Sequence, residues 1–454
     1  MVYALAVAAL VLRAAFIRPG GGMRFLIPWS LVIVVAMLGE LVPPAKHARW
    51  GGGGLLAGLD NLLLPLAVML TIWCCIAPSS AASLLRTGGK LYVWCMTANA
   101  TLAIVDTGYD LSTFLRPFWS REGDMTTVAA RAEAMGRLSG IINQPSSAGL
   151  AYSLAGLLAI YLYTRTPRKL YPILTLVTIG GLLTVSKVFI LIGIPLMLLY
   201  LLKSSTGSRK AGILFAFLVA TGAILQTGLF QGWKGLDFLT RLLSPPDDQS
   251  LIGFYTAGRW VEDSPMMTVI MEALRVSPLT GVGAGGWDVA YDSSWAQTIV
   301  VSGLLGIVGL AAVLVGFFRL AKLTLNPERK RFTLFLAAML CAASFGLPAL
   351  TTNRIGVIVW TITALLVLAH RQGPEGRQTW ITPGADRSEL LLERPLGSAT
   401  GRPVVLRRTD THPAGPAKPA RLGGLVRGKG APFRERGLFR PLRSRVSSQI
   451  LAGP

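Results

Sequence analysis

The sequence predicts an all-α polytopic membrane protein with about 11 transmembrane helices, a large structured extracytoplasmic loop and a disordered basic cytoplasmic tail. Three observations support this fold class. Of the 454 residues, 52% are hydrophobic and only 15% are charged, and the mean hydropathy is +0.54. Apolar stretches of the roughly 20 residues that a helix needs to cross a bilayer recur as far as residue 370. Lysine and arginine are distributed unevenly among the connectors.

Most of the predicted spans follow one another through short connectors. They cover residues 2–17, 25–42, 56–78, 87–106, 147–164, 170–185, 188–202, 211–231, 294–318, 332–347 and 355–370. The first resembles a signal sequence, but Arg13 interrupts it and no small-residue cleavage site follows, so we expect it to be retained. Residues 170–202 are too long for one ordinary span, and we expect a tight turn near Ser186 and Lys187 to divide them.

The basic residues predict the orientation of the chain. If the carboxyl terminus is inside, the inner connectors contain 15 lysines and arginines in 45 positions, and the outer connectors contain 12 in 123. The inner connectors are 18–24, 79–90, 165–169, 203–210 and 319–331, and the outer ones are 43–54, 107–145, 186–187, 232–294 and 348–354. Because basic residues concentrate in cytoplasmic connectors, the carboxyl terminus is predicted to be cytoplasmic.

The net charge of +22 first suggests a nucleic-acid partner, but its distribution argues against one. Residues 371–454 contain 16 basic and 6 acidic side chains among many prolines and glycines, and they lack apolar periodicity. They are predicted to form a disordered tail. Its expected partner is the anionic inner leaflet, where each basic residue contributes about 1 kcal/mol; a solvated linker without a partner is the alternative.

All four cysteines fall inside predicted spans. They are Cys74, Cys75, Cys95 and Cys341. This placement argues against a disulfide framework, and their spacing does not match a metal site. The acids of the outer connectors lie singly or in loop pairs such as Asp247 and Asp248, and basic side chains can take the place of a metal beside a diphosphate, so we expect no metal and no cofactor.

Two predicted outer connectors, 107–145 and 232–294, are too long to be simple joins within the membrane domain at residues 1–370. The second contains an amphipathic helix-like run at 264–276 and the turn-rich sequence GVGAGGW at 281–287. We expect the two loops to be structured and to form a cap over an outer active site.

Arg259 is the first candidate for binding a ligand in that cap. It follows Gly258 and precedes the helix-like run. A guanidinium group can bind the oxygens of a phosphate through two parallel hydrogen bonds. The alternative is an ion pair with Glu262 or Asp263.

The first long loop ends with further candidates. Arg137 and Asn143 stand just before the fifth span, where Ser146 or Ser147 can cap the helix. Lys187 is a third basic group at the outer surface. The structural alternatives are a capped helix start beside a stray arginine, and a lysine that extends from the span toward the interface.

These segments together resemble the O-antigen ligase and polymerase superfamily, over roughly residues 130–320. The resemblance is carried by Arg137–Gly140 with Asn143–Pro145, by Leu183–Lys187 (LTVSK), by Gly258–Arg259 with Ser277–Gly283 (SPLTGVG), and by Asp292–Gly306. In the ligase branch, a histidine stands eleven residues before the glycine that matches Gly303. Here that position is Asp292, which favours a polymerase.

The resemblance implies transfer of a glycan from a polyprenyl-diphosphate carrier to a glycan acceptor, at the outer face of a bacterial plasma membrane. Asp292 would be a general base, and Arg137, Arg259 and Lys187 would stabilise the diphosphate. Asn143 and Ser186 complete the implied substrate-binding set. For Asp292 the alternative role is an N-cap of the following helix.

Three other functions remain open from the sequence. An enzyme like the O-antigen ligases would transfer the glycan to a lipid or protein acceptor. A transporter or flippase would share the polytopic layout, although few charges lie within the spans and no internal repeat is evident. A non-catalytic scaffold would use the basic tail for docking.

Overall fold

The computed structural model describes residues 7, 26–41, 55–119, 128–204, 234–236, 239, 260–262, 264–285, 293–370 and 372. The predicted span at 211–231, almost all of the span at 2–17 and almost all of the tail lie outside the described residues. The chain divides into two units, residues 1–380 and 381–454, and every described helix belongs to the first.

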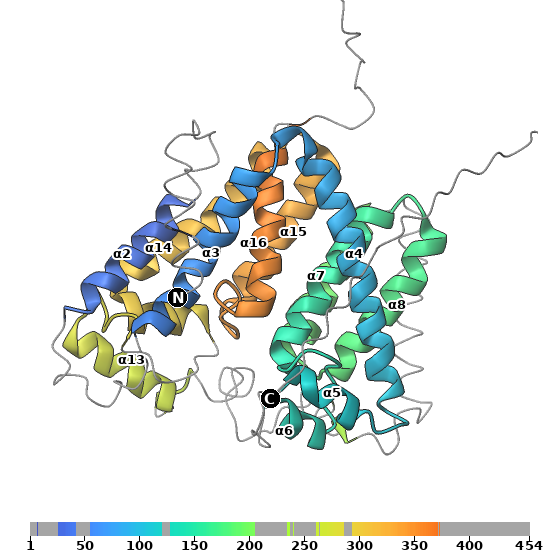
Figure 1. Ribbon diagram of the computed structural model, residues 1–454, viewed down its shortest axis with the longest axis horizontal. Coiled ribbons are helices and arrows are strands. Elements are labelled where there is room, and N and C mark those ends of the chain that lie inside the picture. The colour runs from blue at the N-terminus through green and yellow to red at the C-terminus, as the bar shows by residue number, and fades with distance from the viewer. Residues whose placement is uncertain are drawn as a thin grey trace, which may run out of the picture. The chain divides into compact units, whose positions relative to one another are not determined.

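Every regular element among the described residues is a helix, which confirms the predicted all-α class (Figure 1). The helices are α2 (Ile27–Gly39), α3 (Leu55–Cys75), α4 (Pro78–Val105), α5 (Ser112–Trp119), α6 (Val128–Ala134), α7 (Pro145–Tyr163), α8 (Pro167–Leu183), the π-helix η4 (Val188–Gly193), α9 (Ile194–Ser204), α13 (Pro265–Val276), α14 (Ser294–Leu323), α15 (Pro327–Ala343) and α16 (Asn353–Ala369).

Three described helices are long and apolar enough to cross a membrane. They are Gly58–Cys75, Pro145–Tyr163 and Ser294–Leu323. Shorter apolar helices cover Ile27–Gly39, Val188–Ser204 and Arg354–Ala369. These lengths and compositions are those of a helical membrane protein. The total of about 11 spans stays a prediction.

One predicted connector is wrong. Residues 79–90 were expected to join two spans, but α4 already begins at Pro78 and continues to Val105. Proline is well suited to the first turn of a helix, because the backbone N–H that it lacks would have no partner inside the helix. Arg86 and Lys90 therefore belong to this 28-residue helix.

The predicted division of residues 170–202 is confirmed. α8 ends at Leu183 and η4 begins at Val188. Between them, Val185 has a φ of 45°, a left-handed conformation that a β-branched residue rarely adopts. The break thus lies where the sequence places Ser186 and Lys187.

α7 is at the centre of the described bundle. It packs against α4, α8 and η4, and 89% of the residues in its apolar stretch are buried. Small residues allow this close packing: a Cβ atom at Gly149 would lie 2.2 Å from Ser186 Oγ, and one at Gly156 would overlap the sulfur of Met197. α7 therefore positions its neighbours on several sides.

The connectors gather at two ends of the helices. At the loop-rich end, Leu138 N–H donates to Leu183 O, and Arg354 donates to Phe118 O. Figure 1 shows α5, α6 and α13 on this side. At the basic end, Arg165 pairs with Glu328. One end of the described helices is therefore rich in loops and short helices, and the other carries an arginine–glutamate ion pair.

Candidate functional site

A groove of about 860 Å³ opens between α4, α16 and the start of α7. Most of its wall is apolar and includes Leu85 and Met96 of α4 and Ile355, Ile362 and Leu365 of α16. On each of these two helices the lining extends over about 15 Å of helix axis. A hydrocarbon chain fits such a wall, because the wall offers it dispersion contacts and almost no charge.

The polar part of the groove is at the loop-rich end. Asn143, Gln144 and Ser147 line it from the start of α7, and Thr352 and Arg354 line it from the start of α16. Among the described lining residues, Arg354 is the single charged one. Its Nη2 donates to Phe118 O at 3.1 Å. The groove is therefore amphiphilic, with a cation at one end.

Asn99 fixes the connector that carries Asn143. Its amide nitrogen donates to Ser139 O at 3.1 Å and to the Tyr152 hydroxyl at 2.8 Å. Its amide oxygen accepts from Ile141 N–H at 2.8 Å. Because Asn99 is 2% exposed, these bonds form away from water and hold the connector against α4.

The structure brings Arg137 and the Ser186–Lys187 segment together. Arg137 Nε donates to Thr184 O at 3.3 Å, and its Nη2 donates to Val185 O at 3.4 Å. Arg137 is half-buried, and its guanidinium group bonds to the two residues that precede Ser186 and Lys187 in the sequence. Two motifs 47 residues apart in sequence therefore meet at the loop-rich end, and we call this meeting point the Arg137 cluster.

Ser186 does not line the groove. Its hydroxyl is 1% exposed, faces Gly149 of α7 and has no hydrogen-bond partner among the described residues. Ser147 and Ala151 do line the groove, and they lie about 200° around the helix axis from Gly149. The Arg137 cluster and the groove with Asn143 are consequently on opposite faces of α7.

Arg259 and Asp292 lie outside the described residues, but both of their carboxyl-side neighbours are described. Trp260 Nε1 donates to Phe345 O at 3.4 Å, and Ser293 Oγ donates to Ser344 O at 3.1 Å. Two segments that are far apart in sequence therefore meet on consecutive carbonyls of the turn after α15. The same turn leads to Thr352 and Arg354 at the groove.

The N-cap of α14 is Ser293, whose hydroxyl accepts from Ala296 N–H at 3.4 Å. The alternative that Asp292 caps this helix is therefore wrong. The expectation that Ser146 or Ser147 caps α7 is wrong as well, because α7 has Gln144 as its N-cap and Ser147 Oγ instead donates to Gln144 Oε1.

The SPLTGVG segment packs into a break in α14. Gly303 interrupts the helix with a φ of 58°. Leu304 N–H donates to Pro278 O at 2.9 Å, and Val282 N–H donates to Val300 O at 2.8 Å. Backbone groups released by the break are thus paired with the inserted turn. The positive φ at the break explains why position 303 is a glycine.

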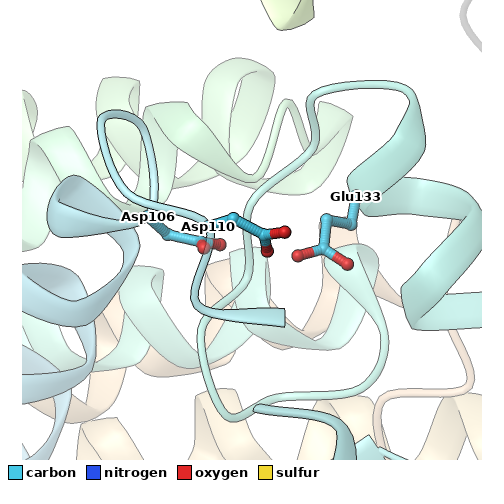
Figure 2. Close-up of side chains that lie close together, drawn as sticks. All are labelled: Asp106, Asp110 and Glu133. Carbon is cyan, nitrogen blue, oxygen red and sulfur yellow. The ribbon is translucent and has the colours of Figure 1, made fainter. Parts of the chain in front are cut away.

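Asp106 at the end of α4 comes together with two acids of the first long loop, Asp110 and Glu133, which the sequence did not predict (Figure 2). Ligand oxygens of Asp106, Asp110 and Glu133 lie within 4.8 Å of one another. Oxygen ligands of this kind suit a hard cation such as Ca²⁺. Asp106 also accepts from Leu111 N–H, and Asp110 accepts from Ser112 N–H, so two of the three carboxylates have turn-forming roles.

The environment shifts the pKa values of these acids in different directions. Burial raises the pKa of Glu133, and the negative charges of Asp106 and Asp110 raise it further. Hydrogen bonds from Ser112 lower the pKa of Asp110. Repulsion within the cluster therefore falls chiefly on Glu133.

Comparison with known protein families, curated proteins and solved structures finds no match. The sequence did not predict Arg354 and Thr352 as site residues, because their predicted connector is only seven residues long. It also missed Asn99, which lies inside a predicted span. A polar amide in the middle of an apolar span was the available signal.

Proposed function

We propose that the protein is a membrane glycosyltransferase that polymerises glycans carried on a polyprenyl diphosphate, at the outer face of a bacterial plasma membrane. The motif resemblance to the O-antigen ligase and polymerase superfamily supports this proposal. The observation that carries it is the meeting of Trp260 and Ser293, the neighbours of Arg259 and Asp292, on the turn formed by Ser344 and Phe345.

In the proposed reaction, a hydroxyl oxygen of the acceptor sugar attacks the anomeric carbon of the donor glycan. The bond from that carbon to the diphosphate oxygen breaks, and the diphosphate leaves with the bonding electrons. Asp292 takes the proton of the attacking hydroxyl. Because negative charge grows on the leaving diphosphate, Arg259 stabilises the transition state.

A polymerase holds two lipid-linked glycans at once, a donor and an acceptor. The two cation-bearing places on opposite faces of α7 support this requirement. Arg137, which bonds to the segment before Lys187, marks one of them, and Arg354, which lines the groove together with Asn143, marks the other. The buried hydroxyl of Ser186 then acts by packing against Gly149 beneath the first place.

The test is a reaction of purified full-length protein with lipid-linked repeat units, followed by separation of the products by length. The wild type is expected to yield a ladder, and Arg259→Ala and Asp292→Asn are expected to yield none while remaining in the membrane. Arg275→Ala and Asp288→Asn, which change the same kinds of residue in the same loop, are expected to retain the ladder.

The products also separate the competing functions. A single glycan moved to a lipid or protein acceptor would indicate a ligase. Movement of the intact lipid-linked glycan across the bilayer, without a new glycosidic bond, would indicate a flippase. Normal ladders from Arg259→Ala and Asp292→Asn would remove these residues from the mechanism.

A further inference from the structure

The groove between α4 and α16 has the shape and polarity of a site for one lipid chain with an anionic head. Its long wall is apolar, and its described charge is a single arginine at the loop-rich end. Described acidic residues do not line it. The apolar chain of a lipid would therefore contact the apolar wall, and its negative headgroup would lie at the end of the groove that carries the arginine.

Arg354 is held in a position to bind such a head. Its side chain is exposed at the groove end, and its bond to Phe118 O occupies one of the five N–H donors of a guanidinium. The fork geometry suits two oxygens of one phosphate. Arg354 also lies in the first turn of α16, where the helix dipole favours negative charge.

Further polar groups line the groove at the start of α7 and beside Arg354 at the start of α16. The amide of Asn143 is half-buried and makes no side-chain hydrogen bond within the described part of the chain. Thr352, by contrast, donates its hydroxyl to Pro348 O at 2.8 Å. Asn143 thus has amide donors available to share a phosphate with Arg354.

We propose that this groove binds the lipid end of the polyprenyl carrier, with the isoprenoid chain along α4 and α16 and the phosphate on Arg354 and Asn143. The choice of this lipid over a bulk phospholipid rests on the proposed function. The lining agrees with it, because the groove offers a largely apolar wall along two helices and one cation at its end. Arg354 is accordingly a substrate-binding residue.

The experiment measures binding of an isotope-labelled polyprenyl monophosphate to the purified full-length protein, without any acceptor. Arg354→Ala is expected to weaken binding about tenfold, as the loss of one charge-assisted contact does. Arg354→Lys is expected to lose less, because the charge remains. Arg319→Ala changes an exposed arginine near the carboxyl end of α14 and is expected to bind like the wild type.

A second variant tests the apolar part of the groove. Gly88 lines it, and a Cβ atom at that position would meet nothing within 4 Å. Gly88→Leu therefore adds side-chain volume to the groove without a clash at its first atom, and it is expected to weaken binding about tenfold or more. This variant still tests the groove if Arg354→Ala does not fold.

The outcomes separate the inference from the proposed function. Unchanged affinity in both Arg354→Ala and Gly88→Leu would overturn the groove assignment. Displacement of the labelled lipid by an equal concentration of phosphatidylglycerol in mixed micelles would show that the groove takes bulk phospholipid, and would overturn it too. Arg354-dependent binding without any glycan ladder would leave the groove assigned and refute the transferase.

Discussion

Arg137 donates a hydrogen bond from Nε to the carbonyl oxygen of Thr184 at 3.3 Å, across 47 residues of sequence. The contact ties the connector before α7 to the break between α8 and η4. It lies next to Val185, whose left-handed conformation costs about 1–3 kcal/mol. Surrounding contacts must hold this conformation, and Arg137 supplies two of them.

Arg137→Ala is expected to lower the free energy of unfolding by about 1–2 kcal/mol, because two long charge-assisted hydrogen bonds are lost. Val185→Gly is expected to recover about 1 kcal/mol in that background, since glycine adopts a positive φ without strain. Thermal unfolding in detergent measures both effects. Equal stabilities of the wild type and Arg137→Ala would show that the break is held by other contacts.

Asn99→Leu is expected to destabilise the protein by about 3 kcal/mol or more. The change leaves the buried groups that bond to Asn99 without their partner, and each such loss costs about 1–3 kcal/mol. Thr101→Ala is the control, because Thr101 Oγ1 bonds only to its own helix at Thr97 O. The same unfolding assay compares them, and a similar loss for both variants would contradict the clamping role of Asn99.

Gly303→Ala is expected to cost about 2–4 kcal/mol, from backbone strain and overpacking together. Its φ is 58°, and the added Cβ would lie 2.5 Å from the carbonyl atoms of Leu279. Gly346→Ala is the matched control, because a Cβ atom there would meet nothing within 4 Å. The two variants are compared by their midpoints of thermal unfolding. Similar midpoints would mean that the inserted turn adapts to the methyl group.

The acidic cluster predicts a pH dependence of stability. A carboxyl whose pKa is raised on folding holds its proton more tightly in the folded state. The contribution of Glu133 is therefore most favourable at low pH, and it decreases as the pH rises from the ordinary value of 4.5 through the raised pKa. Asp110→Asn removes a neighbouring charge, so the pKa of Glu133 falls toward its ordinary value and the decrease becomes shallower.

Unfolding midpoints measured between about pH 4 and 7 test this prediction. The range starts near the pKa of ordinary carboxyl groups, because at lower pH many other carboxyl groups would take up protons as well. Glu262→Gln, an exposed acid outside the cluster, is the control and should keep the wild-type slope. Parallel curves for Asp110→Asn and the wild type would show that the charge of Asp110 does not act on Glu133.

The proposed orientation is tested by thiol labelling in a cysteine-free background. Tyr109 at the loop-rich end is 74% exposed, and Leu325 at the basic end is 64% exposed. An impermeant maleimide applied to intact cells is expected to label Tyr109→Cys and to leave Leu325→Cys unlabelled until the membrane is opened. The reverse pattern would place the loop-rich end in the cytoplasm and remove the outer-face reaction.

The sequence by itself determined the helical class and the division at Ser186–Lys187, and its motif marked the glycine at position 303 where α14 breaks. Each of these depends on local properties: apolar length, proline and glycine placement, and the spacing of a short motif. Such properties need no knowledge of what lies across the bundle.

Only the tertiary structure decided which residues meet. It placed Arg137 against Thr184, Asn143 and Arg354 in the lining of one groove, and the acids Asp106, Asp110 and Glu133 in one cluster. It also gave the cap of α14 to Ser293 rather than Asp292. The physical reason is that an apolar helix carries little information about its partners in a membrane, where packing of small residues such as Gly149 sets which faces touch.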